Sequence, residues 1–87
     1  MKQNSNFLLR TVADSLVLVP VGEATEKFPG MISMNATGAF LWEQLADDQT
    51  EASLTQALLD KYEVSEEKAR QDVQGFLKTL SAIGAVL

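Results

Sequence analysis

The chain has 87 residues and a net charge of −5, with 46% hydrophobic and 22% charged residues. These values are typical of one small globular domain and exclude a disordered chain. The sequence contains no His and no Cys, which excludes zinc sites, thiol nucleophiles, disulfides and imidazole acid–base chemistry. The acidic balance argues against binding of a phosphate backbone, because such binding depends on clustered Lys and Arg.

The N-terminal residues are polar and carry a single charge, at Lys2. We expect residues 1–6 to be a flexible segment and residues 7–87 to form one domain. No apolar run approaches the roughly 7–15 residues of a signal-peptide core or the roughly 20 of a membrane span. The sequence therefore predicts a cytoplasmic protein that does not contact a membrane.

The first third of the chain has the composition of short strands. They are expected at Phe7–Val12, Leu16–Val19 and Met31–Met34. The second is apolar on both faces and rich in β-branched residues, which is typical of a central strand. Pro20 has no N–H to donate, so pairing should end there. Residues 21–27 resemble a loop or a loose hairpin, and the spacing predicts a three-stranded antiparallel sheet.

After Asn35 the apolar residues recur at steps of three and four, which is the helical period. Helices are expected at about residues 36–46, 51–62 and 66–83, with Asn35, Thr50 and Ser65 as their N-caps. The third has the strongest pattern, formed by Ala69, Val73, Phe76, Leu80 and Ile83 and widened by Leu77. Gly84 should end it. Gly75 lies inside this helix at a cost of about 1 kcal/mol against Ala, which indicates close packing or a close approach there.

Three strands followed by three helices define an α+β fold. The second and third helices form a helix-turn-helix pair, which with the hairpin predicts a winged-helix-like domain. Residues 35–63 carry six acidic residues and one basic residue, while residues 64–87 carry three of each. In a DNA-binding winged helix, the second helix would lie near the phosphates and support the recognition helix. Its acidic surroundings would repel phosphate. We therefore expect no nucleic-acid partner, although a winged-helix DNA-binding regulator is the alternative that the shape permits.

The sequence contains no catalytic constellation. The neighbouring carboxylates Asp47-Asp48 and Glu66-Glu67 point to different sides of a helix or turn, which makes them unsuitable as acid–base pairs. Ser33 and Ser53 have no His to activate them. We expect a protein that is not an enzyme and that needs no metal and no cofactor.

The third strand carries no charge along its whole length, Met31 to Met34. Proteins usually guard an edge strand with Lys, Pro or a bulge, and here Pro29 guards only the start. An unguarded edge accepts an extended peptide by strand addition. Three alternatives remain: these residues belong to the core, the N-terminal segment covers the edge, or two copies of the chain pair there as a homodimer.

The segment around the third strand carries a recognisable pattern. Asn35-Ala36-Thr37-Gly38 is followed by Trp42, four residues after the glycine. This pattern, together with the length and the element order from Phe7 to Leu87, resembles the hallmark of PqqD-like proteins. The resemblance implies a winged-helix-like recognition element that binds the leader region of a ribosomally synthesised precursor peptide. It also implies a partner enzyme that modifies this peptide, often a radical SAM enzyme with iron–sulfur clusters.

The resemblance further implies where the peptide binds. In the family the leader pairs with the third strand and lies against the third helix. The matching positions for backbone pairing are Met31, Ile32, Ser33 and Met34, and those for the helix wall are Arg70, Val73, Gln74 and Leu77. The motif residues Asn35, Thr37, Gly38 and Trp42 should shape the strand-to-helix turn and the core rather than contact the peptide. Ile32→Pro is expected to remove binding, and Arg70→Glu to weaken binding of an acidic leader. The long segment 22–30 leaves the peptide register open.

Overall fold

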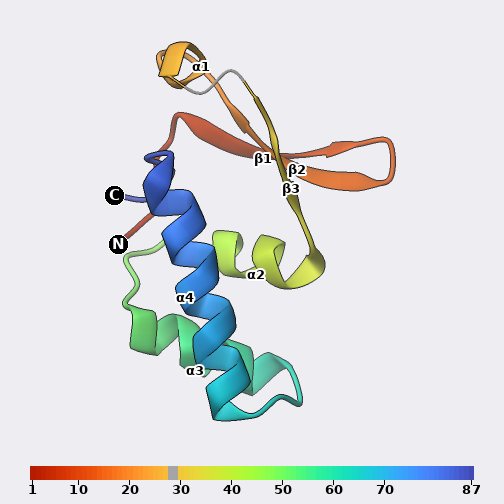
Figure 1. Ribbon diagram of the computed structural model, residues 1–87, viewed down its shortest axis with the longest axis vertical. Helices are drawn as coiled ribbons and strands as arrows, with labels where there is room; N and C mark the ends of the chain where they lie inside the picture. Colours follow the sequence, from red (N-terminus) through yellow and green to blue (C-terminus); the bar gives the residue numbers. More distant parts are fainter. Residues whose placement is uncertain (28–29) are drawn as a thin grey trace.

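The computed structural model describes residues 1–27 and 30–87. Its elements, in chain order, are β1 (Phe7–Val12), β2 (Ser15–Pro20), α1 (Ala24–Lys27), β3 (Ile32–Met34), α2 (Ala36–Gln44), α3 (Glu51–Lys61) and α4 (Glu66–Ala82) (Figure 1). The α+β, winged-helix-like arrangement of a small sheet followed by three longer helices is confirmed. The predicted role of Pro29 in guarding the third strand lies outside the described residues. Within the described part, no helix combines the length and the apolar character that a membrane crossing requires.

The strands form one antiparallel sheet in the order β1-β2-β3, so β2 is central as predicted. Its last residue, Pro20, pairs with Phe7, and the β1–β2 ladder ends there. β3 pairs with β2 from Leu18↔Ile32 to Leu16↔Met34. β3 is therefore a short edge strand, and the register fixes which of its residues face the helices.

The segment expected to be a loop contains the four-residue helix α1. Gly22, with φ of +60°, makes the turn into it, and the Thr25 hydroxyl donates a hydrogen bond to the Gly22 carbonyl. Ala24 is buried and joins the hydrophobic core. Sequence periodicity did not reveal α1 because four residues make barely one helical turn.

The three predicted N-caps are confirmed. The side chains of Asn35, Thr50 and Ser65 each accept a hydrogen bond from the backbone N–H three residues later, at 2.7, 3.0 and 3.1 Å. Thr50 and Ser53 also form a reciprocal capping box. Each cap satisfies an N–H group that the first turn of a helix leaves unpaired. These residues therefore fix where the chain changes from extended to helical.

We expect Asn35→Ala to lower the free energy of unfolding by about 1 kcal/mol, because it leaves the Gly38 N–H without its side-chain acceptor. Urea denaturation measures this change. Asn35→Asp is the matched control, since its carboxylate still accepts the bond and should retain most of the stability. Equal losses in the two variants would contradict a capping role.

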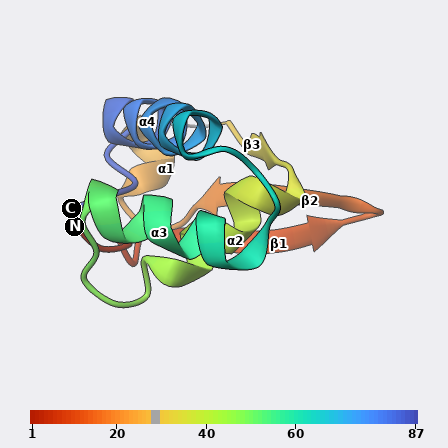
Figure 2. The same cartoon turned by 90° about the horizontal axis from the view of Figure 1, so that it is seen from below.

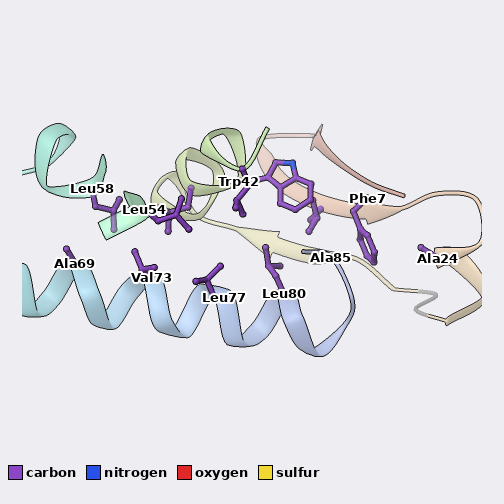
Figure 3. Packing of buried hydrophobic residues seen from close by; sticks show 13 residues of the cluster. Phe7, Ala24, Trp42, Leu54, Leu58, Ala69, Val73, Leu77, Leu80 and Ala85 are labelled. Carbon is purple, nitrogen blue, oxygen red and sulfur yellow. The ribbon is translucent and has the colours of Figure 1, made fainter. Parts of the chain in front are cut away.

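α4 packs its apolar stripe against α2 and α3 (Figure 3). Trp42 is only 3% exposed, which confirms its predicted place as a core anchor. The largest fully buried side chains are Leu18, Leu41, Leu45, Leu54, Leu58, Val73 and Leu80. Because they come from β2 and all three longer helices, a single core holds the sheet and the helices together.

The two ends of the chain lie together (Figure 1). Gly84, with φ of +75°, ends α4 in a Schellman motif, which turns the chain back. Gln3 and Val86 then form an antiparallel bridge, and Lys2 and Leu87 exchange backbone hydrogen bonds of 3.2 and 2.9 Å. These contacts connect residues 1–6 to the C-terminus.

Two further contacts hold the N-terminal segment. The Gln3 side-chain amide donates to the Trp42 carbonyl at 2.6 Å. The terminal ammonium of Met1 donates to Asp48 at 2.6 Å, and this bond holds the pKa of the Asp48 carboxyl below its usual range. The segment therefore packs beside the end of α2, away from β3.

Candidate functional site

The outer edge of β3 lies beside the apolar core, against which Ile32 and Met34 pack. Among the described residues, β2 is the only strand that pairs with β3. Gln3 of the N-terminal segment pairs with Val86, and both ends of the chain lie away from β3 (Figure 2), so this segment does not cover the edge. Backbone groups on the outer side of β3 are therefore available to a further strand.

A groove of about 670 Å³ lies between this edge and α4. Figures 1 and 2 show α4 running along one side of the molecule, past β3 and across α3. The groove residues come from β3, from the start of α2 and from one flank of α4. They are Ile32, Ser33, Met34, Asn35, Thr37, Gly38, Leu41, Val64, Lys68, Gln71, Asp72, Gly75, Phe76, Thr79 and Leu80. This volume is within the range of about 300–1,000 Å³ of small-ligand sites.

The floor of the groove is apolar and its rim is polar. Leu41 and Leu80 are buried at the bottom, and Phe76 is half-buried beside them. On the rim, Lys68 and Asp72 form an ion pair of 2.7 Å. Such a surface suits apolar side chains of a ligand whose backbone stays hydrated or paired. Within the described residues, no three His, Cys, Asp or Glu side chains gather as a metal site would need.

The structure places the predicted β3 residues at the groove, with one exception. Ile32 and Met34 are half-buried and pack against the core, yet both also line the groove. Ser33 is exposed and lines it too. Met31 precedes the strand, is 61% exposed and does not belong to the lining. The alternative interpretation, that these residues belong only to the core, therefore explains the burial of Ile32 and Met34 but not their position on the groove.

The four predicted α4 residues lie elsewhere. Val73 and Leu77 are buried in the core. Arg70 and Gln74 are exposed on the opposite flank of the helix, and Arg70 pairs with Glu66 at 3.1 Å. None of the four lines the groove. The flank of α4 that does so consists of Lys68, Gln71, Asp72, Gly75, Phe76 and Thr79.

The residues of the Asn-x-Thr-Gly pattern build the turn from β3 into α2. Asn35 caps the helix, and Gly38 receives that bond. A Cβ at Gly38 would lie 3.1 Å from the Met34 sulfur and 3.3 Å from the Asn35 side-chain oxygen, closer than ordinary contacts. Glycine at this position therefore lets Met34 of β3 and the Asn35 cap pack closely against the start of α2, in keeping with the expected role of this motif in the turn. Three members of the motif, Asn35, Thr37 and Gly38, also line the groove.

The fold and the groove together define a small winged-helix-like domain whose open sheet edge faces a long helix. The sequence matches a family described as coenzyme PQQ synthesis protein D (PqqD) over residues 15–86. The match covers most of the chain, so the chain belongs to the PqqD family. No curated protein matches the sequence.

Two solved structures share the fold along almost the whole chain. TbiB1 in complex with the TbiA(beta) leader peptide has a TM-score of 0.75 at 19% identity, and the alignment covers 98% of this chain and 93% of that one. Lasso peptide synthetase B1 complexed with the leader peptide has a TM-score of 0.74 at 22% identity, covering 99% and 95%. Because both alignments cover nearly the whole chain, the shared fold includes the β3 edge as well as α4.

Proposed function

We propose that this protein binds the leader region of a ribosomally synthesised precursor peptide by adding it as a fourth strand to β3. The observation that carries the proposal is the open β3 edge, which faces the α4 groove in a PqqD-family fold. The two solved structures of this fold contain leader peptides, which supports the same class of ligand here.

The short length of β3 determines how the binding energy must be divided. An edge of three residues offers only a few backbone hydrogen bonds, each worth about 0.5–1.5 kcal/mol net. Micromolar binding needs about 8 kcal/mol, and ordering of the peptide adds a further cost. The groove must therefore supply most of the affinity, through alternate peptide side chains that point toward α4. We assign this role to Lys68, Gln71, Asp72, Gly75, Phe76 and Thr79.

The protein acts as a carrier in this proposal, and the chemistry belongs to its partner. The chain has no His and no Cys to serve as an imidazole base or a thiol nucleophile. It would hold the leader while a modifying enzyme, a radical SAM enzyme in the first instance, acts on the rest of the precursor. We place this step in the cytoplasm, where ribosomes make the precursor.

A winged-helix DNA-binding role has less support. Residues 35–63, which contain α3, carry six acidic residues and one basic residue. On α4, Lys68 and Arg70 are each paired with an acidic side chain four residues away. Phosphate would have to compete with these carboxylates, so the charge distribution favours a peptide over DNA.

The direct test is titration with a leader peptide, taken from a short open reading frame beside the gene, while backbone amide shifts are followed by NMR. Shifts should concentrate on β3 and on the flank of α4 that lines the groove. Absence of binding, or shifts confined to the outer edge of β1, would contradict strand addition at β3. The mass in solution reports the homodimer alternative, because an edge-paired dimer should dissociate as peptide is added.

Filling the groove gives a second test. Thr79→Trp places a large ring in the groove, whereas Lys78→Trp places the same ring on the neighbouring exposed position that does not line it. We expect Thr79→Trp to weaken leader binding by about 10-fold or more and Lys78→Trp to leave it unchanged. Isothermal titration calorimetry measures both. Equal affinities would place the ligand outside this groove.

A further inference from the structure

Gly75 lies inside the 17-residue helix α4, where glycine is among the poorest helix formers. Three other glycines have a reason within the chain. Gly22 and Gly84 have positive φ, and Gly38 is crowded by Met34 and Asn35. Gly75 has a helical backbone, and a Cβ built on it would meet nothing within 4 Å. Neither backbone conformation nor packing within the described structure requires a glycine at this position.

Gly75 faces the groove, so the absence of a side chain there affects the shape of the groove wall. It belongs to the flank of α4 that lines the cavity together with β3. Asp72 precedes it by three residues and Thr79 follows it by four, so these are its neighbours on the helix surface. A side chain at position 75 would project between them into the open space of the groove. The glycine therefore keeps a recess open on the wall opposite β3.

We propose that Gly75 determines specificity: the recess that it leaves accepts one large apolar side chain, aromatic or branched, from the bound peptide. This inference rests on the proposed peptide-binding function. The half-buried Phe76 and the buried Leu80 supply the apolar and aromatic contacts at the same wall. A glycine on one surface and a large side chain on the other is a way for two elements to approach closely and still fill the space between them.

Selection from a phage-displayed library of random peptides tests the inference. Phage that bind the groove-blocked Thr79→Trp variant are removed first, and binders are then selected from the remainder. Peptides selected on the wild-type protein should share one position occupied by Phe, Tyr, Trp, Leu or Ile. Peptides selected on Gly75→Leu should carry Gly, Ala or Ser at that same position. A wild-type-selected peptide should bind Gly75→Ala about 10-fold and Gly75→Leu about 100-fold more weakly.

The matched control is Gln74→Leu, which adds the same side chain to an exposed position outside the groove and should leave the affinity unchanged. Thermal unfolding provides a readout of opposite sign: Gly75→Ala should raise the Tm by up to about 8 °C while binding falls. Identical peptide pools and affinities for wild type and Gly75→Leu would overturn the role of Gly75 and leave peptide binding standing. Failure of the wild-type protein to enrich any peptide would overturn both.

Discussion

Proline at one of two neighbouring β3 positions should strongly weaken peptide binding while the domain stays folded. Consecutive residues of an antiparallel strand turn their N–H groups alternately toward the two sides. Ile32 and Ser33 pair with β2 on one side only. One of the two N–H groups therefore bonds to β2, and the other faces the open edge where the peptide is proposed to add.

Ile32→Pro and Ser33→Pro should consequently differ. Proline at the position whose N–H bonds to β2 removes a hydrogen bond of the sheet and destabilises it. Proline at the position whose N–H faces the open edge removes a donor to the peptide, and its ring lies in the path of the added strand. We expect the folded variant to bind its leader about 100-fold more weakly, which calorimetry measures after circular dichroism confirms the fold. Ser33→Ala keeps the N–H and is the control. Wild-type affinity in the folded proline variant would show that the peptide does not pair with β3.

The elements that could be predicted from the sequence are those with a local physical signal. Asn35, Thr50 and Ser65 each carry a side-chain oxygen just before a segment with helical periodicity of apolar residues. Each of them caps a helix in the structure. Pro20 could not continue a ladder, and β2 ends at it. The edge position of the third strand followed from the predicted three-stranded sheet with the second strand at its centre, which the structure confirms. The lack of charge along this strand predicted an unguarded edge, because charge and proline are what usually protect an edge.

The wall of the groove could not be predicted because helical periodicity identifies a buried stripe but not what lies beside it. On α4 the buried centre is formed by Ala69, Val73, Leu77 and Leu80. Phe76 lies on one flank of this centre, and Arg70 and Gln74 lie on the other. Only the placement of β3 decides which flank becomes the groove. The one signal in the sequence was Gly75, which lies on the flank that lines the groove. The close packing that its cost within a helix indicated is not found among the described residues, because a Cβ there would meet nothing within 4 Å.

A buried leucine on α3 provides the largest expected effect on stability. Leu54 is fully buried in the cluster that includes Trp42, Leu45 and Val73. Leu54→Ala leaves a cavity as well as losing apolar contacts, which costs about 2–5 kcal/mol. A domain of this size has roughly 4–13 kcal/mol of stability in total, from about 0.05–0.15 kcal/mol per residue. The substitution should thus remove a large part of it.

The fluorescence of Trp42, the single tryptophan of the chain, reports this loss during urea denaturation. Gln56→Ala, at an exposed position of the same helix, should change the free energy of unfolding by less than about 0.5 kcal/mol. Leu54 does not line the groove, so folded Leu54→Ala should bind its leader with unchanged affinity. Leader peptide at about 100 times its Kd should then restore about 2.7 kcal/mol. Weakened affinity of the folded variant would mean that α3 also shapes the groove, because α4 packs directly on it.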